Sequence, residues 1–154
     1  MKTNCLFSLF PLAAVFWLML ILPANPEEPR LSPAQVSVIA KQIARLQYPQ
    51  ERALAAGWTD AKKVAEFICR PLATKVLKRR SKHTDRVFLG TNEPNTLRLM
   101  SNSRLQGSGQ ARAGNEWRGF TFTCRLSPMT GKAASFETSS SPQMPKQRVL
   151  PTRR

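Results

Sequence analysis

The sequence predicts an α+β fold in which N-terminal helices pack on a small antiparallel β-meander, with one disulfide between the two layers. Apolar residues recur at helical spacing up to residue 77, whereas apolar and polar residues alternate from residue 85 onward. Two cysteines, one in each half, fall on the faces expected to be buried. A helical half followed by a strand half is typical of a two-layer α+β domain.

Composition limits what this domain can be. The chain has 154 residues and a formal charge of +15, from 24 Lys and Arg against 9 Asp and Glu. With 42% hydrophobic residues it is too apolar to be wholly disordered. A single histidine and three cysteines leave little material for an elaborate catalytic site.

The N-terminal segment predicts export. Lys2 precedes an apolar run over residues 6–22, and Ala24 follows it. We interpret residues 1–24 as a secretory signal peptide with cleavage after Ala24, although Leu22 is larger than is usual three residues before the cut. An uncleaved membrane anchor is the alternative, because the run reaches the lower limit for spanning a bilayer. In either case we expect the rest of the chain to be exported to the periplasm.

The first predicted helix follows a Pro-rich linker over residues 25–31. Ser32 is suited to cap this helix, and Pro33 to occupy its first position. Residues at helical spacing then form an apolar stripe: Val36, Ile39, Ala40, Ile43 and Leu46. A core face is the preferred interpretation of this stripe, and a membrane-surface helix is the alternative.

A second helix is predicted to begin at Thr59 or Asp60. Glu66 and Arg70 are spaced for a favourable ion pair along it. We expect Pro71 to end or kink this helix, which then resumes for two turns.

Five strands are predicted after residue 85, over residues 86–89, 96–100, 104–112, 117–126 and 133–138. Residues 113–116 fit a hairpin loop, and Gly131 fits a turn with a positive φ. Gly107 and Gly109 are expected to permit a bulge or close backbone packing. The domain is therefore predicted to span residues 32–138, followed by a disordered basic tail over residues 139–154.

Cys69 and Cys124 are predicted to form a disulfide. They are the two cysteines left after signal-peptide cleavage, and a disulfide is the usual state of such a pair in an oxidising compartment. Cys124 shares a strand face with Phe120 and Phe122, and Cys69 lies beside Ile68 on the second helix. A reactive thiol pair is the alternative, but the chain has no Cys-x-x-Cys spacing to favour it.

Four segments together resemble a known family: residues 61–71 (AKKVAEFICRP), 85–90 (DRVFLG), 105–112 (LQGSGQAR) and 117–126 (WRGFTFTCRL). They are similar to small exported Gram-negative proteins grouped as the domain-of-unknown-function family numbered nine hundred and thirty. The resemblance covers residues 58–137 and is strongest where a Gly-rich strand precedes Trp-x-x-Phe-x-x-x-Cys. It implies export, paired cysteines and these domain limits, and it implies no activity.

Motifs for catalysis, cofactors and metals are missing from the sequence. The segment Gly107-Ser108-Gly109 is followed by neither the third glycine nor the helix of a dinucleotide site. His83 has no recognisable nucleophile motif with it, and Asp85 is expected to cap a helix or balance Arg86. We therefore predict a non-enzymatic protein that uses no cofactor and binds no metal.

A basic segment is the sequence's one candidate binding site: Lys75, Lys78, Arg79, Arg80 and Lys82. These cations are expected to lie off the apolar stripe. They favour contact with an anionic envelope component, such as acidic lipid, lipopolysaccharide or peptidoglycan. A solvated helix end is the alternative, because cations also suit the C-terminal dipole. We do not expect nucleic acid as a partner, since an exported protein rarely meets it.

Two further functions stay open at this stage. One is a membrane-anchored accessory subunit that keeps its N-terminal segment. The other is a regulator of an envelope enzyme. Trp58 and Trp117 are expected either to add stacking to a binding site or to cover the junction of sheet and helix.

Overall fold

A computed structural model describes residues 29–91, 93 and 95–140 of the chain. Its elements are α1 (Pro33–Ala44), α2 (Pro49–Ala56), α3 (Asp60–Lys63), the π-helix η1 (Val64–Cys69), α4 (Arg70–Arg80), β1 (Thr84–Leu89), β2 (Leu97–Ser101), β3 (Arg104–Ala113), β4 (Glu116–Ser127) and β5 (Lys132–Ser140). The predicted signal peptide and the tail from residue 141 lie outside the described residues. Strand β5 runs two residues past the predicted domain end at residue 138.

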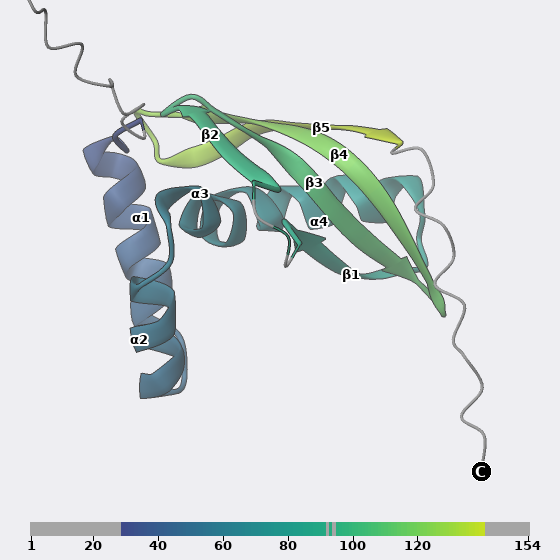
Figure 1. Cartoon of the computed structure of the whole chain (residues 1–154), viewed down its shortest axis with the longest axis horizontal. Coiled ribbons are helices and arrows are strands. Elements are labelled where there is room, and N and C mark those ends of the chain that lie inside the picture. The colour runs from purple at the N-terminus through teal and green to yellow at the C-terminus, as the bar shows by residue number, and fades with distance from the viewer. Residues whose placement is uncertain (1–28, 92, 94, 141–154) are drawn as a thin grey trace, which may run out of the picture.

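The predicted α+β class is confirmed. The strands form one antiparallel sheet, and helices α3 and α4 lie behind it in the view of Figure 1. Strands β2 to β5 pair in sequence order as a meander, whereas β1 pairs with β3 rather than with β2. Both short strands share one edge of the long β3, with Leu97 opposite Gly107 and Leu89 opposite Gly109.

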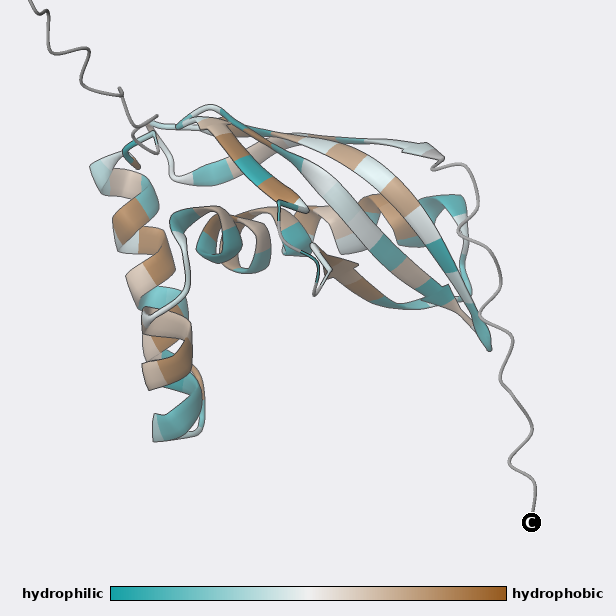
Figure 2. Ribbon diagram, viewed as in Figure 1, coloured by the Kyte–Doolittle hydropathy of each residue, from teal (hydrophilic) through white to brown (hydrophobic). Residues whose placement is uncertain are grey.

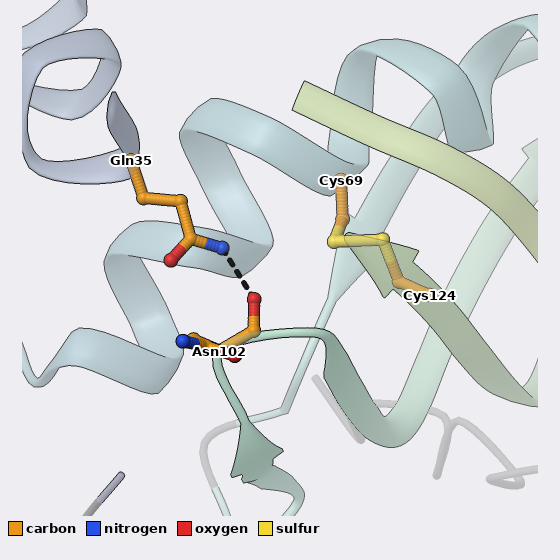
Figure 3. Close-up of a disulfide and its surroundings, with 4 residues drawn as sticks. All are labelled: Gln35, Cys69, Asn102 and Cys124. Atoms are coloured by element: carbon orange, nitrogen blue, oxygen red, sulfur yellow. Dashed lines mark hydrogen bonds between the residues drawn. A yellow bond between two sulfur atoms is a disulfide. The ribbon is translucent and has the colours of Figure 1, made fainter. Parts of the chain in front are cut away.

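Helix α1 begins where the sequence predicts. The Ser32 side chain accepts a hydrogen bond from the Gln35 backbone N–H, and the Gln35 side chain accepts one from the Ser32 backbone N–H. This reciprocal capping box satisfies two donors that the helix itself leaves free. Gln35 is fully buried, and its amide also donates to the Asn102 carbonyl at 2.6 Å in the β2–β3 turn (Figure 3). The start of α1 is therefore tied to the sheet.

Helix α2 was not predicted from the sequence. It starts at Pro49, buries only Ala55 and has no side-chain cap. A single buried position gives too short an apolar stripe to be recognised as a helix. Helices α1 and α2 follow one another in a column that projects from one end of the sheet (Figure 1). Apolar residues of this column appear brown in Figure 2.

Pro71 does not end the second predicted helix. Helical structure runs from Asp60 to Arg80 without a break, and its middle is the π-helix η1. The Arg70 N–H bonds to the Ala65 carbonyl, five residues back, so the turn before the proline is wider than in an α-helix. A proline has no N–H to donate, and its ring crowds the preceding helical turn. The wide turn of η1 relieves this crowding.

The core lies between the helices and the inward face of the sheet. The buried side chains include Val64, Ala65, Ile68, Leu89, Leu105, Phe120, Phe122, Leu126 and Phe136. Gly109 confirms the expected close packing, because a Cβ there would lie 2.7 Å from the Phe120 ring. The phenylalanines of β4 and β5 contact one another, with Phe122 and Phe136 stacked at 5.2 Å between ring centroids.

The predicted disulfide is confirmed. Cys69 and Cys124 are fully buried and bonded, with their Cα atoms 6.2 Å apart. Cys69 ends η1, and Cys124 lies in β4 opposite Leu105. The bond therefore joins the helical layer to the middle of the sheet (Figure 3).

Removal of this bond should strongly destabilise the protein. The bridge closes a separation of 55 residues. In the chain-entropy model, the Cys69→Ala/Cys124→Ala variant should lose about 4 kcal/mol in its free energy of unfolding. Denaturant unfolding measures this loss. Thiol titration of the denatured, unreduced chain from Asn25 onward should find no free thiol, and two free thiols would contradict the bridge.

Candidate anionic-surface site

Helix α4 places the predicted cations on its outer side. Its inward stripe consists of Ala73, Val76 and Leu77, which pack on the core. Lys75, Lys78 and Arg79 occupy the opposite face at the spacing of helical neighbours. All three side chains are exposed. The helical periodicity that buries one face of α4 thus places these cations on the opposite face.

Lys82 follows the end of the helix and is also exposed. Among the described residues, Lys75, Lys78, Arg79 and Lys82 form no ion pair. Glu66 pairs with Lys62 and Arg70, each at 3.1 Å. The predicted Glu66–Arg70 pair is thereby confirmed. We call Lys75, Lys78, Arg79 and Lys82 the α4 stripe.

Arg80 differs from the α4 stripe. Arg80 lies four residues after Val76 and three after Leu77, and so on the same face of the helix as they do. Its guanidinium donates to the Thr138 hydroxyl of β5. Its side chain therefore joins the end of α4 to the sheet. The expectation that all five cations lie off the apolar stripe holds for the other four and not for Arg80.

The helix dipole accounts for part of this arrangement. Lys78, Arg79 and Arg80 occupy the last turn of α4, where the unpaired carbonyl groups carry partial negative charge. Lys75 and Lys82 lie outside that turn. Dipole stabilisation therefore does not account for Lys75 and Lys82.

The charge of Asp85 interacts with Arg86, as the sequence suggested, but the main partner of Asp85 is Arg112. Asp85 accepts hydrogen bonds at 3.0 and 3.1 Å from Arg112 of β3, which is half-buried. Arg112 also lies over the Trp117 ring, 5.6 Å from its centroid. Sequence alone does not indicate this pair, because it depends on β1 pairing with β3. Among the described residues, His83 is exposed and belongs to no metal-ligand cluster.

The comparisons leave the family open. No family model matches the chain, and neither does any curated protein or solved structure. The resemblance to the domain-of-unknown-function family numbered nine hundred and thirty therefore stays a prediction. Within the described part of the chain, no helix is long and apolar enough to cross a membrane.

The Asp85–Arg112 pair gives a measurable pH effect. Hydrogen bonds from Arg112 hold the pKa of the Asp85 carboxyl below its ordinary value of 3.8. Because the folded pKa is depressed, the pair stabilises the fold at neutral pH, and this contribution is lost as the pH falls through the folded pKa. Carboxyl NMR titration should show the lowered pKa and its return towards 3.8 in Arg112→Gln. An unchanged titration in that variant would contradict the pair.

Proposed function

We propose that this protein is an exported, non-enzymatic binding module that contacts anionic envelope components through the α4 stripe. One observation carries the proposal: three exposed cations line the side of α4 that faces away from the core and the exposed Lys82 follows the helix end, all without an ion-pair partner among the described residues. Acidic lipid head groups, lipopolysaccharide phosphates and peptidoglycan carboxylates all supply the complementary charge. Periplasmic export is part of the proposal, and the buried disulfide supports it because such bonds persist in oxidising compartments.

Electrostatics sets the strength of such a contact. Each Lys or Arg near an anionic membrane surface contributes on the order of 1 kcal/mol. Four cations acting together therefore suffice for reversible adhesion. The Debye length is only about 8 Å at physiological ionic strength, so the attraction weakens steeply with added salt.

Charge reversal on the α4 stripe tests the proposal. We expect Lys78→Glu/Arg79→Glu to abolish sedimentation of the exported protein with phosphatidylglycerol vesicles at low salt. The fold should persist, because both side chains are exposed on the face of α4 that points away from the core. Arg80 is left unchanged, since it bonds to Thr138. Circular dichroism of the variant should match that of the parent.

A matched control comes from helix α1. Lys41→Glu/Arg45→Glu makes the same change in charge at exposed positions near another helix C-terminus. This control should keep most of the vesicle binding. Truncation after Ser140 removes the basic tail without cutting β5. Equal binding by the parent and the α4 double variant would contradict the proposal.

A second function is favoured by the α1–α2 column. Val36, Tyr48 and Leu54 are 53%, 55% and 65% exposed on it. Exposed apolar side chains on a projecting element favour protein contact. This observation supports the alternative of a membrane-anchored accessory subunit or regulator of an envelope enzyme.

N-terminal sequencing of the exported protein separates these two functions. A binding module released by signal-peptide cleavage should start at Asn25. An anchored accessory subunit should retain the apolar segment over residues 6–22 and fractionate with membranes. A start at Asn25 would exclude the anchor.

A further inference from the structure

The outward face of the sheet is free of helices. Along β4, Phe120, Phe122 and Cys124 point into the core. Because side chains alternate along a strand, Trp117 and Thr121 point to the opposite face. Helix α4 passes behind the strands in Figure 1, and no helix of the described chain is drawn in front of them. This outward face is a separate surface from the α4 stripe, on the opposite layer of the domain.

An aromatic platform lies at one end of this face. Phe88 and Trp117 are 44% and 45% exposed, and their rings stack at 5.6 Å between centroids. The Arg112 guanidinium lies over the Trp117 ring. Two large exposed rings held together offer a ligand an apolar contact area on this face.

A shallow polar depression lies farther along the same face. Its volume is about 390 Å³, and outward side chains line it: Gln106, Thr121, Thr123, Glu137 and Ser139. Gln106 donates to the Thr123 hydroxyl at 3.3 Å. From Trp117 to Thr123 the strand extends about 20 Å, at about 3.4 Å per residue. An extended chain of several units is therefore long enough to reach both features.

Arginines on this face lie opposite other arginines on neighbouring strands, which destabilises the sheet. Arg86 lies directly opposite Arg112, and Arg104 lies directly opposite Arg125. Like charges in directly opposed positions destabilise a sheet. Arg112 and Arg125 have carboxylate partners, Arg125 at 3.9 Å from Glu137. Arg86 shares the Asp85 carboxylate with Arg112, and Arg104 and the neighbouring Arg98 have no carboxylate partner among the described residues, so the face carries excess positive charge.

We propose that the outward sheet face binds an acidic glycan chain. Sugar rings stack on Phe88 and Trp117, and the arginines of this face meet the carboxylate or phosphate groups of the chain. The hydroxyl and amide groups of the depression exchange hydrogen bonds with sugar hydroxyls, and Glu137 accepts from them. This site is independent of the α4 stripe and does not require it.

A glycan fits this face better than a nucleic acid does. A sugar chain offers hydroxyl donors that the Glu137 carboxylate and the Thr121 and Thr123 hydroxyls of the depression can accept. The buried disulfide also belongs to compartments in which glycans are common partners and nucleic acids are rare.

Calorimetric titration of the exported protein with a soluble oligogalacturonate tests the proposal. Trp117→Ala should weaken binding by about tenfold or more, because the stacking platform is lost. Arg86→Gln/Arg98→Gln should also weaken binding and should flatten its salt dependence. A maltooligosaccharide of the same length lacks the carboxylates, and it should bind far more weakly than the oligogalacturonate.

Matched controls lie on the α1–α2 column. Tyr48→Ala removes an exposed aromatic ring, and Lys41→Gln/Arg45→Gln removes two exposed charges. Neither control should weaken oligogalacturonate binding as the face variants do. Lys78→Glu/Arg79→Glu should lower oligogalacturonate binding no more than Lys41→Glu/Arg45→Glu does. The glycan test therefore does not depend on the result of the vesicle test.

Three results would overturn the proposal. The first is oligogalacturonate binding that Trp117→Ala leaves unchanged while circular dichroism shows a folded variant. The second is no binding of oligogalacturonate by the parent protein at low salt. The third is tighter binding of a single-stranded oligothymidylate of similar charge, which would make the face a nucleic-acid surface.

Discussion

The Cys69–Cys124 disulfide is the constraint on which the arrangement of the two layers depends. It joins the wide turn of η1 to the middle of β4, and both sulfur-bearing side chains are fully buried. Because Cys124 points to the core, the bond fixes which face of the sheet the helices cover. It thereby also determines which residues are left outside, on the far side of α4 and on the opposite face of the sheet.

A polar anchor complements the disulfide at the other end of the domain. The buried Gln35 side chain bonds both to its own helix start and to the β2–β3 turn, while the Ser32 hydroxyl donates to the Pro128 carbonyl at 2.7 Å. Gly131 adopts a φ of 68°, and a Cβ there would crowd the backbone of Ala34. Two turns of the sheet therefore hold the first turn of α1, and α2 extends away from this fixed point.

Local patterns in the sequence predict much of this fold, and long-range pairings account for what they miss. Alternation around Phe120 and Phe122 locates β4 and its inward face, and the Ser32 cap locates α1. Helix α2 escapes prediction because one buried residue makes no periodicity. The position of β1 depends on the shared edge of β3, which no local pattern encodes. For the same reason sequence places Asp85 beside Arg86, whereas the fold pairs it with Arg112.

The two candidate sites also differ in whether local sequence patterns or long-range strand pairing brings their residues together. Helical spacing brings Lys75, Lys78 and Arg79 together, so sequence alone predicts the α4 stripe. The outward face requires three strands in register before Phe88, Arg112 and Trp117 meet. Among the described residues no charged side chain is buried, so the cations lie on the outer surfaces. Their mutual repulsion opposes compaction. The disulfide offsets this by restricting the unfolded chain. An anion that binds only the folded state would add to its stability.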